Sequence, residues 1–343
     1  MPKPCRIAVI GAGMALAPHA RSLRELQDAG MLEVAAIWSP SEARRSAAAT
    51  QWGFPARDSF AAIADDAAID AALLLTPANA RLEFVEALAG AGKHILSEKP
   101  LERTTGAAEH IVARCAAAGV KLGVVFQYRF RPSSIRLREV LAAGELGAPS
   151  VVQVAIPWWR EQRYYDEPGR GTRARDGGGV LISQAIHTLD LMLSLLGPVA
   201  ELAAIAGTSA LHRMECEDTL GAGLRFANGA LGGVFASTAC YPGAAETLSI
   251  TGTKGAATIA AGALRLSWFD GRREEVAGDA ATGGGADPMA FANDAHRALI
   301  GDFVDAIRNG RDPAVSGREA LGVHRLIDAL LASAGQGRAL APA

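Results

Sequence analysis

Lysine, paired cysteines, long apolar runs and an excess of one charge are all scarce in this 343-residue sequence. Only five of its 34 basic residues are lysines, and the formal net charge is −2. This balance predicts no electrostatic surface for nucleic acid. No apolar run approaches the roughly 20 residues that a membrane span needs, so we expect no membrane partner. A small-molecule partner is the expectation that remains.

The four cysteines, at positions 5, 115, 216 and 240, show no CxxC spacing. This pattern argues against a disulfide framework and against a zinc site, so the cysteines are expected to be small buried hydrophobes and no metal is predicted. The start of the chain, MPKPCRIAVIGAG, lacks the order of a signal peptide, which predicts a cytoplasmic location.

Two periodicities alternate over the first 125 residues, as is typical of a parallel sheet covered by helices. Apolar strand-like runs occupy 6–10, 34–38, 71–75, 94–97 and 121–125, and helical stretches occupy 15–29, 41–52, 79–91 and 104–118. Strands this uniformly apolar must be buried on both faces. The fold class predicted is therefore α/β, with a doubly wound parallel sheet in an N-terminal domain, residues 1–126.

The pattern changes after residue 126 to a helix, a strand, a long polar loop and another helix, and then to strands without intervening helices. Short turns between strands favour a large antiparallel or mixed sheet in a second domain, residues 127–343. A loop is predicted at 278–288, and helices are predicted at 291–308 and 317–333. The predicted strands are 150–156, 199–206, 218–226, 230–237, 246–251, 255–260 and 263–268.

Gly11 and Gly13 follow the first strand and precede a helix, in the stretch RIAVIGAGMAL. The first glycine allows a tight turn, the second lets the backbone approach a pyrophosphate, and the helix N-terminus supplies N–H donors. Leu16 stands where a third glycine would be expected. The context nevertheless predicts a dinucleotide site that includes Gly11, Gly13 and Met14.

The end of the second strand bears on the choice between NAD and NADP, because a carboxylate there would bind the ribose hydroxyls and repel a 2′-phosphate. This chain has Ser39 at that point, followed by Ser41, Arg44 and Arg45. Hydroxyls beside arginines suit a phosphate. We therefore expect NADP or NAD as cofactor and favour NADP, although a helix arginine is more often simply solvated.

Lys99 lies in HILSEKPL, where an apolar strand ends. The carboxyl edge of a doubly wound sheet is where ligands bind, and Pro100 keeps Lys99 out of helical geometry. A lysine at a strand end can also extend its amine to solvent without any function. Its place beside the predicted cofactor favours a functional role.

A candidate partner for Lys99 lies in GGGVLISQAIHTLD, residues 177–190. Ser183, Gln184, His187 and Asp190 recur at helical spacing on an otherwise apolar helix. A histidine there is often a satisfied core residue, and His187 with Asp190 could be only a buried hydrogen-bonded pair. With a lysine available elsewhere, a site that handles protons is the sharper hypothesis.

The sequence resembles the Gfo/Idh/MocA oxidoreductase family over nearly its whole length. The resemblance is carried by the GxG turn with His19 eight residues after Gly11, LLLTP at 73–77, AGKHILSEKP at 91–100 and GGGVLISQAIHTLD at 177–190. It implies an N-terminal Rossmann dinucleotide-binding domain, residues 1–126, and a C-terminal α/β domain with a large open sheet for substrate binding and oligomerisation, residues 127–343. It also implies hydride transfer between NAD or NADP and a CH–OH or C=O group, commonly of a sugar or polyol. Cofactor contacts are expected from Thr76, Pro77, Glu98, Lys99 and Gln127.

The family's lysine and histidine carry over to Lys99 and His187. Lys99 is expected to act as the general acid/base with His187 assisting, because a partly desolvated lysine beside a cationic nicotinamide gives up its proton more easily. Two departures from the family pattern stand out: Ser183 replaces an aspartate present in many members, and Arg81 replaces a histidine shortly after the TP. The first puts the substrate in doubt more than the chemistry.

Substrate selectivity is expected from the loop 157–179, where aromatic residues alternate with arginines, and from the junction at 127–129. Rings pack on apolar faces of a sugar, and guanidinium groups bind carboxylate or phosphate. A solvated loop or a subunit contact is the alternative. The predicted substrate contacts are Lys99, Tyr128, Arg129, Trp159, Arg170, Arg173, Ser183, Gln184 and His187.

Two other functions fit the same fold. One is an NAD(P)-binding sensor or regulator without turnover, and the other is a glycoside hydrolase that uses bound NAD for transient oxidation. The second sheet lacks helices of its own on one face, which suggests a homodimer or homotetramer.

Overall fold

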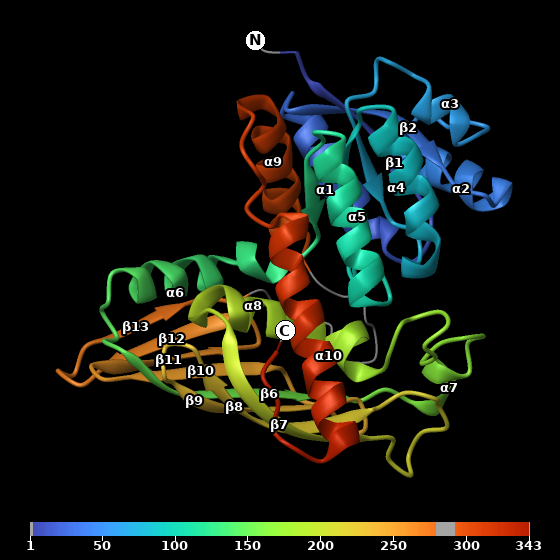
Figure 1. Cartoon of the computed structure of the whole chain (residues 1–343). Helices are drawn as coiled ribbons and strands as arrows, with labels where there is room; N and C mark the ends of the chain where they lie inside the picture. Colours follow the sequence, from blue (N-terminus) through green and yellow to red (C-terminus); the bar gives the residue numbers. More distant parts are fainter. Residues whose placement is uncertain (1–2, 279–291, 343) are drawn as a thin grey trace. The chain divides into compact units, whose positions relative to one another are not determined.

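The computed structural model describes residues 3–278 and 292–342 (Figure 1). The chain divides into two compact units, the first formed by the described residues of 1–126 with 293–321, and the second by those of 127–292 with 322–343. The division after Phe126 coincides with the predicted boundary. Residues 293–321 belong to the first unit, although the sequence pattern grouped them with the second. Except for Gly278, the predicted loop at 278–288 lies outside the described residues.

The first unit is built on a five-stranded parallel sheet with the order β2-β1-β3-β4-β5. Ala8, Val9 and Ile10 in the interior strand β1 are fully buried, as a strand covered on both faces must be. The bounds are β1 (Cys5–Ile10), β2 (Leu32–Trp38), β3 (Ala71–Leu74), β4 (His94–Ser97) and β5 (Leu122–Val124).

Helices flank this sheet in the doubly wound manner expected of right-handed crossovers (Figure 1). One pair, α1 and α9, packs together, and so does the pair α4 and α5. Ser41 and Thr104 cap α2 and α5 through their hydroxyls, which explains where these helices begin. The bounds are α1 (Leu16–Asp28), α2 (Glu42–Trp52), α3 (Ala61–Ala64), α4 (Arg81–Gly90), α5 (Thr105–Ala117), α9 (Asp294–Asn309) and a 3₁₀ turn (Ala78–Ala80).

The second unit contains an eight-stranded sheet with the order β13-β12-β11-β10-β6-β9-β8-β7. It is mixed, because β6 and β9 pair in parallel while the other described neighbours are antiparallel. The bounds are β6 (Pro149–Pro157), β7 (Val199–Gly207), β8 (Thr219–Phe226), β9 (Leu231–Ser237), β10 (Thr247–Gly252), β11 (Gly255–Ala260), β12 (Ala263–Trp268) and β13 (Arg273–Val276).

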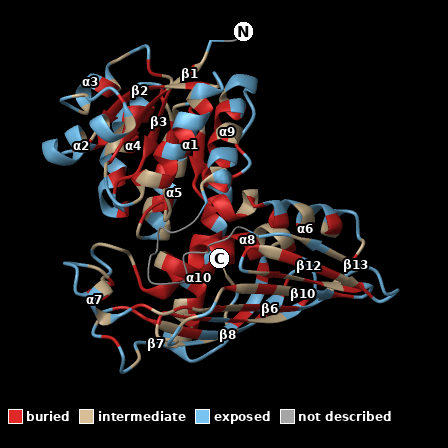
Figure 2. Cartoon of the chain, turned by 180° about the vertical axis from the view of Figure 1, so that it is seen from behind, coloured by how far each residue is buried: buried red, intermediate tan, exposed pale blue. Residues whose placement is uncertain are grey.

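One face of this sheet is buried and the other is open, as the alternating colours along its strands indicate in Figure 2. In β6, Val152 and Val154 are buried while Val151 is 56% exposed; on neighbouring strands Ile205 is 82% and Phe235 41% exposed. Helix α6 packs on β11, β12 and β13. The helices are α6 (Pro132–Ala142), α7 (Gln162–Tyr165), α8 (Ile186–Leu196) and α10 (Gly317–Gln336), with a 3₁₀ turn (Gln127–Phe130) and a π turn (Leu181–Ala185).

The predicted fold class is confirmed, with every predicted strand present within one or two residues of its bounds. The sequence pattern missed β13, because its residues REEV carry no apolar alternation, and it missed the short helices α3 and α7. Among the described residues, no helix is both long and apolar enough to cross a membrane.

Candidate active site

The turn after β1 has a backbone that only glycine can adopt without strain. Gly11 has φ +113°, and a Cβ there would lie 2.9 Å from the carbonyl carbon of Leu75. A Cβ on Gly13 would meet nothing within 4 Å, so the backbone at this point is open to a ligand. No side chain caps α1 through Ala15, and the N–H of Leu16 donates to the carbonyl of Gly13 at 3.1 Å, so a ligand could meet only the later N–H groups of this first turn.

The turn after β3 supports the same interpretation. The hydroxyl Oγ1 of Thr76 is buried and makes no hydrogen bond within the described chain, although buried hydroxyls normally find a partner. Pro77 follows it and leads into the 3₁₀ turn. A polar cofactor would supply the missing partner, so the residues present fit a dinucleotide.

Beyond β2, the structure orders the residues that were expected to meet a ribose phosphate. Ser39 is buried, and its carbonyl accepts a hydrogen bond from Nη1 of Arg45 at 3.1 Å. Ser41 caps α2 by accepting from the backbone N–H of Arg44, whose side chain is exposed. Arg45 was not among the predicted contacts, but its hydrogen bond to the Ser39 carbonyl places its guanidinium at the strand end, and its Nη2 lies 3.8 Å from the exposed carboxylate of Asp58.

Lys99 follows β4 and is half-buried. Its backbone N–H donates to Oε2 of Glu98 at 2.9 Å, and the other carboxylate oxygen of Glu98 lies 2.7 Å from Nε2 of His19. Burial alone would raise the pKa of Glu98, but the hydrogen bond from His19 and the charges of His19, Lys99 and His296 hold that pKa well below its ordinary value. Glu98 is therefore an anion that fixes the backbone of Lys99.

His19, Glu98 and His296 have ligand atoms within 4.8 Å of one another, a donor set that zinc accepts. The rings of the two histidines meet edge to face with centroids 4.9 Å apart. The 2.7 Å contact between His19 and Glu98, however, is a hydrogen-bond distance, shorter than the roughly 3.3 Å that separates two ligands of one tetrahedral zinc ion. We interpret the three residues as a hydrogen-bonded cluster.

In the second unit, Glu217 fixes the glycines that precede α8. Its carboxylate accepts from the backbone N–H groups of Gly179 and Leu181 at 3.2 and 3.1 Å. Burial raises the pKa of Glu217, against the opposing effect of these backbone hydrogen bonds. A Cβ on Gly179 would lie 1.8 Å from the carbonyl oxygen of Glu217, so only glycine fits there.

His187 lies in the first turn of α8 and is buried. Its ring stacks on Tyr128, with centroids 5.0 Å apart and planes inclined by 25°. The guanidinium of Arg131 lies over the same Tyr128 ring at 3.5 Å. Asp190, three residues after His187, instead forms a bidentate ion pair with Arg129, with both N–O distances at 2.7 Å.

The predicted substrate loop forms internal contacts. Arg170 lies over the ring of Tyr164 at 4.2 Å and is paired with Glu167. The amide of Gln184 donates to the Tyr164 hydroxyl at 3.2 Å, which ties this loop to the helical segment that carries His187. Arg173 is exposed, and Ser183 lies in the π turn.

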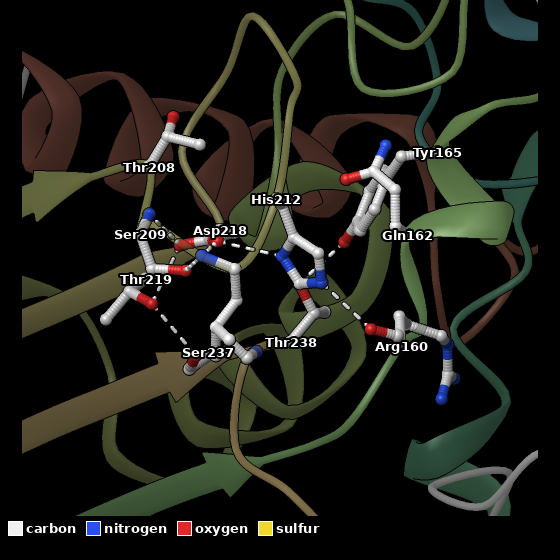
Figure 3. A network of polar contacts seen from close by, with 12 residues as sticks. Arg160, Gln162, Tyr165, Thr208, Ser209, His212, Asp218, Thr219, Ser237 and Thr238 are labelled. Atoms are coloured by element: carbon white, nitrogen blue, oxygen red, sulfur yellow. Dashed lines mark hydrogen bonds and ion pairs between the residues drawn. The ribbon is translucent and has the colours of Figure 1, made fainter.

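A buried polar network anchors the start of this loop (Figure 3). His212 bridges the Asp218 carboxylate and the Arg160 carbonyl, with both distances 2.8 Å, while the Tyr165 hydroxyl lies 2.6 Å from Oγ1 of Thr238. Trp159 also packs near His212, with centroids 6.0 Å apart. The network fixes the backbone on which the predicted contact Trp159 stands.

The structure brings the predicted residues together in two separate groups. Gly11, Thr76 and Lys99 lie at the carboxyl ends of β1, β3 and β4 in the first unit. His187, Tyr128 and the loop arginines belong to the second unit, as does Gln127, which is buried. Sequence reasoning missed Glu217, because a glutamate in the acidic stretch ECED, 30 residues after His187, belongs to no recognised motif.

Two family models match this chain. One, described as "Oxidoreductase family, NAD-binding Rossmann fold", matches residues 5–126, and the other, the "GFO/IDH/MocA C-terminal domain", matches residues 135–258. The fold and the glycine turn define an oxidoreductase with an NAD-binding Rossmann domain. The chain belongs to the Gfo/Idh/MocA family.

Three proteins to which this chain is similar carry named activities. The inositol 2-dehydrogenase of Rhizobium meliloti (strain 1021) is 27% identical over 97% of this chain and 98% of its own. The D-xylose 1-dehydrogenase (NADP(+)) 2 of Haloferax volcanii is 41% identical, but the match covers only 34% of this chain and 36% of that protein. The WlbA dehydrogenase from Bordetella pertussis, solved with NADH and UDP-GlcNAcA, is 26% identical over 98% of both chains, with a TM-score of 0.83.

Proposed function

We propose that this protein is an NAD(P)-dependent dehydrogenase that transfers a hydride between nicotinamide and a CH–OH or C=O group of a sugar, polyol or sugar acid. One observation carries the proposal: Lys99 is held by Glu98 at the same sheet edge as the glycine turn of Gly11. Ligands of doubly wound sheets bind at that edge. Relatives that act on inositol and xylose support the substrate class.

Gly11, Gly13, Met14, Thr76 and Pro77 would hold the cofactor, with further contacts from Glu98 and Gln127. When bound, the nicotinamide supplies the hydride donor or acceptor. Lys99 removes a proton from the substrate oxygen or returns one to it, which is the work of a general acid/base. His187 assists by sharing that proton or by orienting the hydroxyl, and its stacking on Tyr128 fixes its ring for either task.

We further propose that NADP is the favoured cofactor. The end of β2 carries Ser39 and Ser41, and Arg45 is drawn towards Ser39 by its hydrogen bond to that carbonyl. Arg44, the preceding residue in the chain, carries a second cation on an exposed side chain. Charge-assisted hydrogen bonds from arginine suit a 2′-phosphate.

The first test is a fluorescence titration of the purified protein with NADPH and NADH in parallel, followed by assays with myo-inositol, D-xylose and UDP-GlcNAcA. The proposal predicts cofactor binding, tighter for NADPH, and turnover seen as a change in NAD(P)H absorbance. Tighter binding of NADH would refute the NADP preference alone. Cofactor binding without turnover of any sugar or polyol would favour a sensor, and cleavage of a glycoside without net NADH would favour the hydrolase.

Several finer assignments belong to the same proposal. The substrate would be contacted by Tyr128, Arg129, Trp159, Arg170, Arg173, Ser183 and Gln184. Removal of Arg173 should therefore raise KM for anionic substrates and not for neutral ones.

The open sheet face, with Ile205 and Phe235 exposed, would join copies in a homodimer or homotetramer. Sedimentation of the wild type and of Phe235→Lys tests this, because a monomer in both would contradict it. The domain roles and the cytoplasmic location stay predictions.

A further inference from the structure

Arg81 is a buried arginine whose donors all point to backbone carbonyls of two turns. Its Nε and Nη2 donate to the carbonyl of Thr76 at 3.1 and 2.8 Å. Its Nη1 donates to the carbonyls of Glu98 and Pro100. The side chain starts in the first turn of α4 and is only 2% exposed. One guanidinium therefore links the turn after β3 to the turn after β4.

Burial of the Arg81 charge costs desolvation free energy, so stability alone is a weak reason for this link. Burial lowers the pKa of Arg81 to about 10, and the nearby carboxylates of Glu98 and Glu102 oppose that effect. The side chain thus remains cationic at neutral pH. Replacing buried charges by apolar residues of similar volume often leaves stability equal or improved. Arg81 is therefore better explained by the backbone groups that it positions than by a contribution to the stability of the fold.

What it holds is the backbone on both sides of Lys99. The carboxylate of Glu98 accepts the N–H of Lys99, and Arg81 takes the carbonyls of the residues before and after it. Upstream, the N–H of Glu98 donates to the carbonyl of Leu74 at 2.9 Å. The peptide groups that determine where the lysine side chain begins are thus held from three directions.

We propose that Arg81 is a positioning residue for Lys99, and that it also fixes Thr76 so that the cofactor turn and the acid/base are set in one geometry. This inference rests on the proposed role of Lys99 as acid/base. A displacement of about 1 Å in a catalytic group can cost on the order of a hundredfold in rate. Removal of the Arg81 side chain should therefore lower kcat by a large factor while it changes the midpoint of unfolding only slightly.

Lys93 offers a matched control. It is equally buried, lies in the same unit just before β4, and donates through Nζ to the carbonyls of Asp66 and Ile69 at 2.7 and 3.0 Å. Lys93 thus links backbone carbonyls in the same way as Arg81, but at the opposite end of β4, the strand that precedes Lys99. Lys93→Met measures the general cost of removing a buried cation from this unit.

The experiment is a double-mutant cycle between Arg81→Met and Lys99→Ala, with Lys93→Met alongside and the best substrate of the panel above. We expect Arg81→Met to lower kcat by about tenfold to a hundredfold, Lys93→Met to change it by less than about twofold, and Arg81→Lys to lie between. In the Lys99→Ala background, Arg81→Met should have almost no further effect. An equal loss in both backgrounds, or a loss no larger than that of Lys93→Met, would overturn the positioning role while leaving Lys99 as acid/base.

A second readout needs no substrate and separates the positioning role of Arg81 from the acid/base role of Lys99. Because the chain has only five lysines, reductive methylation with ¹³C gives a simple NMR spectrum in which Lys99 is assigned by its absence in Lys99→Ala. Arg81→Met should shift and narrow the Lys99 resonance as that residue gains mobility, whereas Lys93→Met should leave it in place. An unchanged Lys99 resonance in Arg81→Met contradicts positioning. Near-normal turnover of Lys99→Ala would instead refute the proposed function on which positioning rests.

Discussion

The ring of Tyr128 stacks on the imidazole of His187, and the guanidinium of Arg131 lies over the same ring. Aromatic pairs of this kind contribute about 0.5–1.5 kcal/mol beyond their buried area. The stack restricts the orientation of the His187 ring, so it matters for any role of that residue with a hydroxyl group. Tyr128 is the neighbour through which that orientation can be tested.

Tyr128→Phe keeps the stacked ring, whereas Tyr128→Leu removes it. We expect the phenylalanine variant to keep kcat within about threefold and the leucine variant to lose about tenfold, because an unrestrained imidazole spends less time correctly oriented. Steady-state kinetics of both variants, with thermal unfolding as a check on folding, measure this. Equal kcat values in the two variants would show that the stack has no part in turnover.

The bidentate pair between Arg129 and Asp190 is nearly excluded from water, with Asp190 only 1% exposed. Asp190→Asn leaves the guanidinium buried without its counter-charge, and such losses cost about 3–5 kcal/mol. Urea denaturation of Asp190→Asn should show a loss of this size. The double variant Arg129→Met/Asp190→Leu should be more stable than Asp190→Asn, since it buries no unpaired charge. The reverse order would mean that the pair is solvated in solution.

Asp218 should make stability depend on pH at the acid end. Burial would raise its pKa, but hydrogen bonds from Ser209, Thr219 and His212 outweigh this effect and lower it below the ordinary value (Figure 3). A carboxyl whose pKa falls on folding stabilises the protein above its unfolded pKa of about 3.9, and this stabilisation is lost as pH falls through the folded pKa.

Asp218→Asn should therefore cost on the order of 3 kcal/mol at pH 7, and this cost should shrink progressively as pH falls below about 4. Unfolding free energies of both proteins between pH 3 and 7 measure the difference. Ser194→Ala is the control, because the Ser194 hydroxyl donates to the carbonyl of Leu191 on α8 and carries no charge. Its effect on the free energy of unfolding should be independent of pH. A constant difference for Asp218→Asn would contradict the assignment.

Arg44 and Arg45 should distinguish the two cofactors. Loss of a charge-assisted hydrogen bond to phosphate costs about 1.5–3 kcal/mol, so alanine at either position should raise the Kd for NADPH by about tenfold or more. The Kd for NADH should stay within about twofold. Arg24→Ala is the control, because within the described parts of the chain that exposed arginine donates to the Trp52 carbonyl, at the far end of α2. Equal losses for both cofactors would place these arginines in a structural role.

The first unit could be predicted from the sequence because its strands are buried on both faces and read as apolar runs. The strand β13 could not, since Arg273 to Val276 form an edge strand with charged residues. The same limit applies to the site. Lys99 and His187 stand in motifs, but the partners that hold them are set by tertiary packing: Arg81 reaches Glu98 across 17 residues, and Tyr128 meets His187 across 59.

The most direct test of the account is Lys99→Ala. We predict that this variant still binds NADPH and loses at least about a hundredfold in kcat on the best sugar or polyol of the panel. That combination would assign Lys99 to the chemical step. Near-normal kcat in a folded Lys99→Ala protein that still binds the cofactor would contradict the central claim.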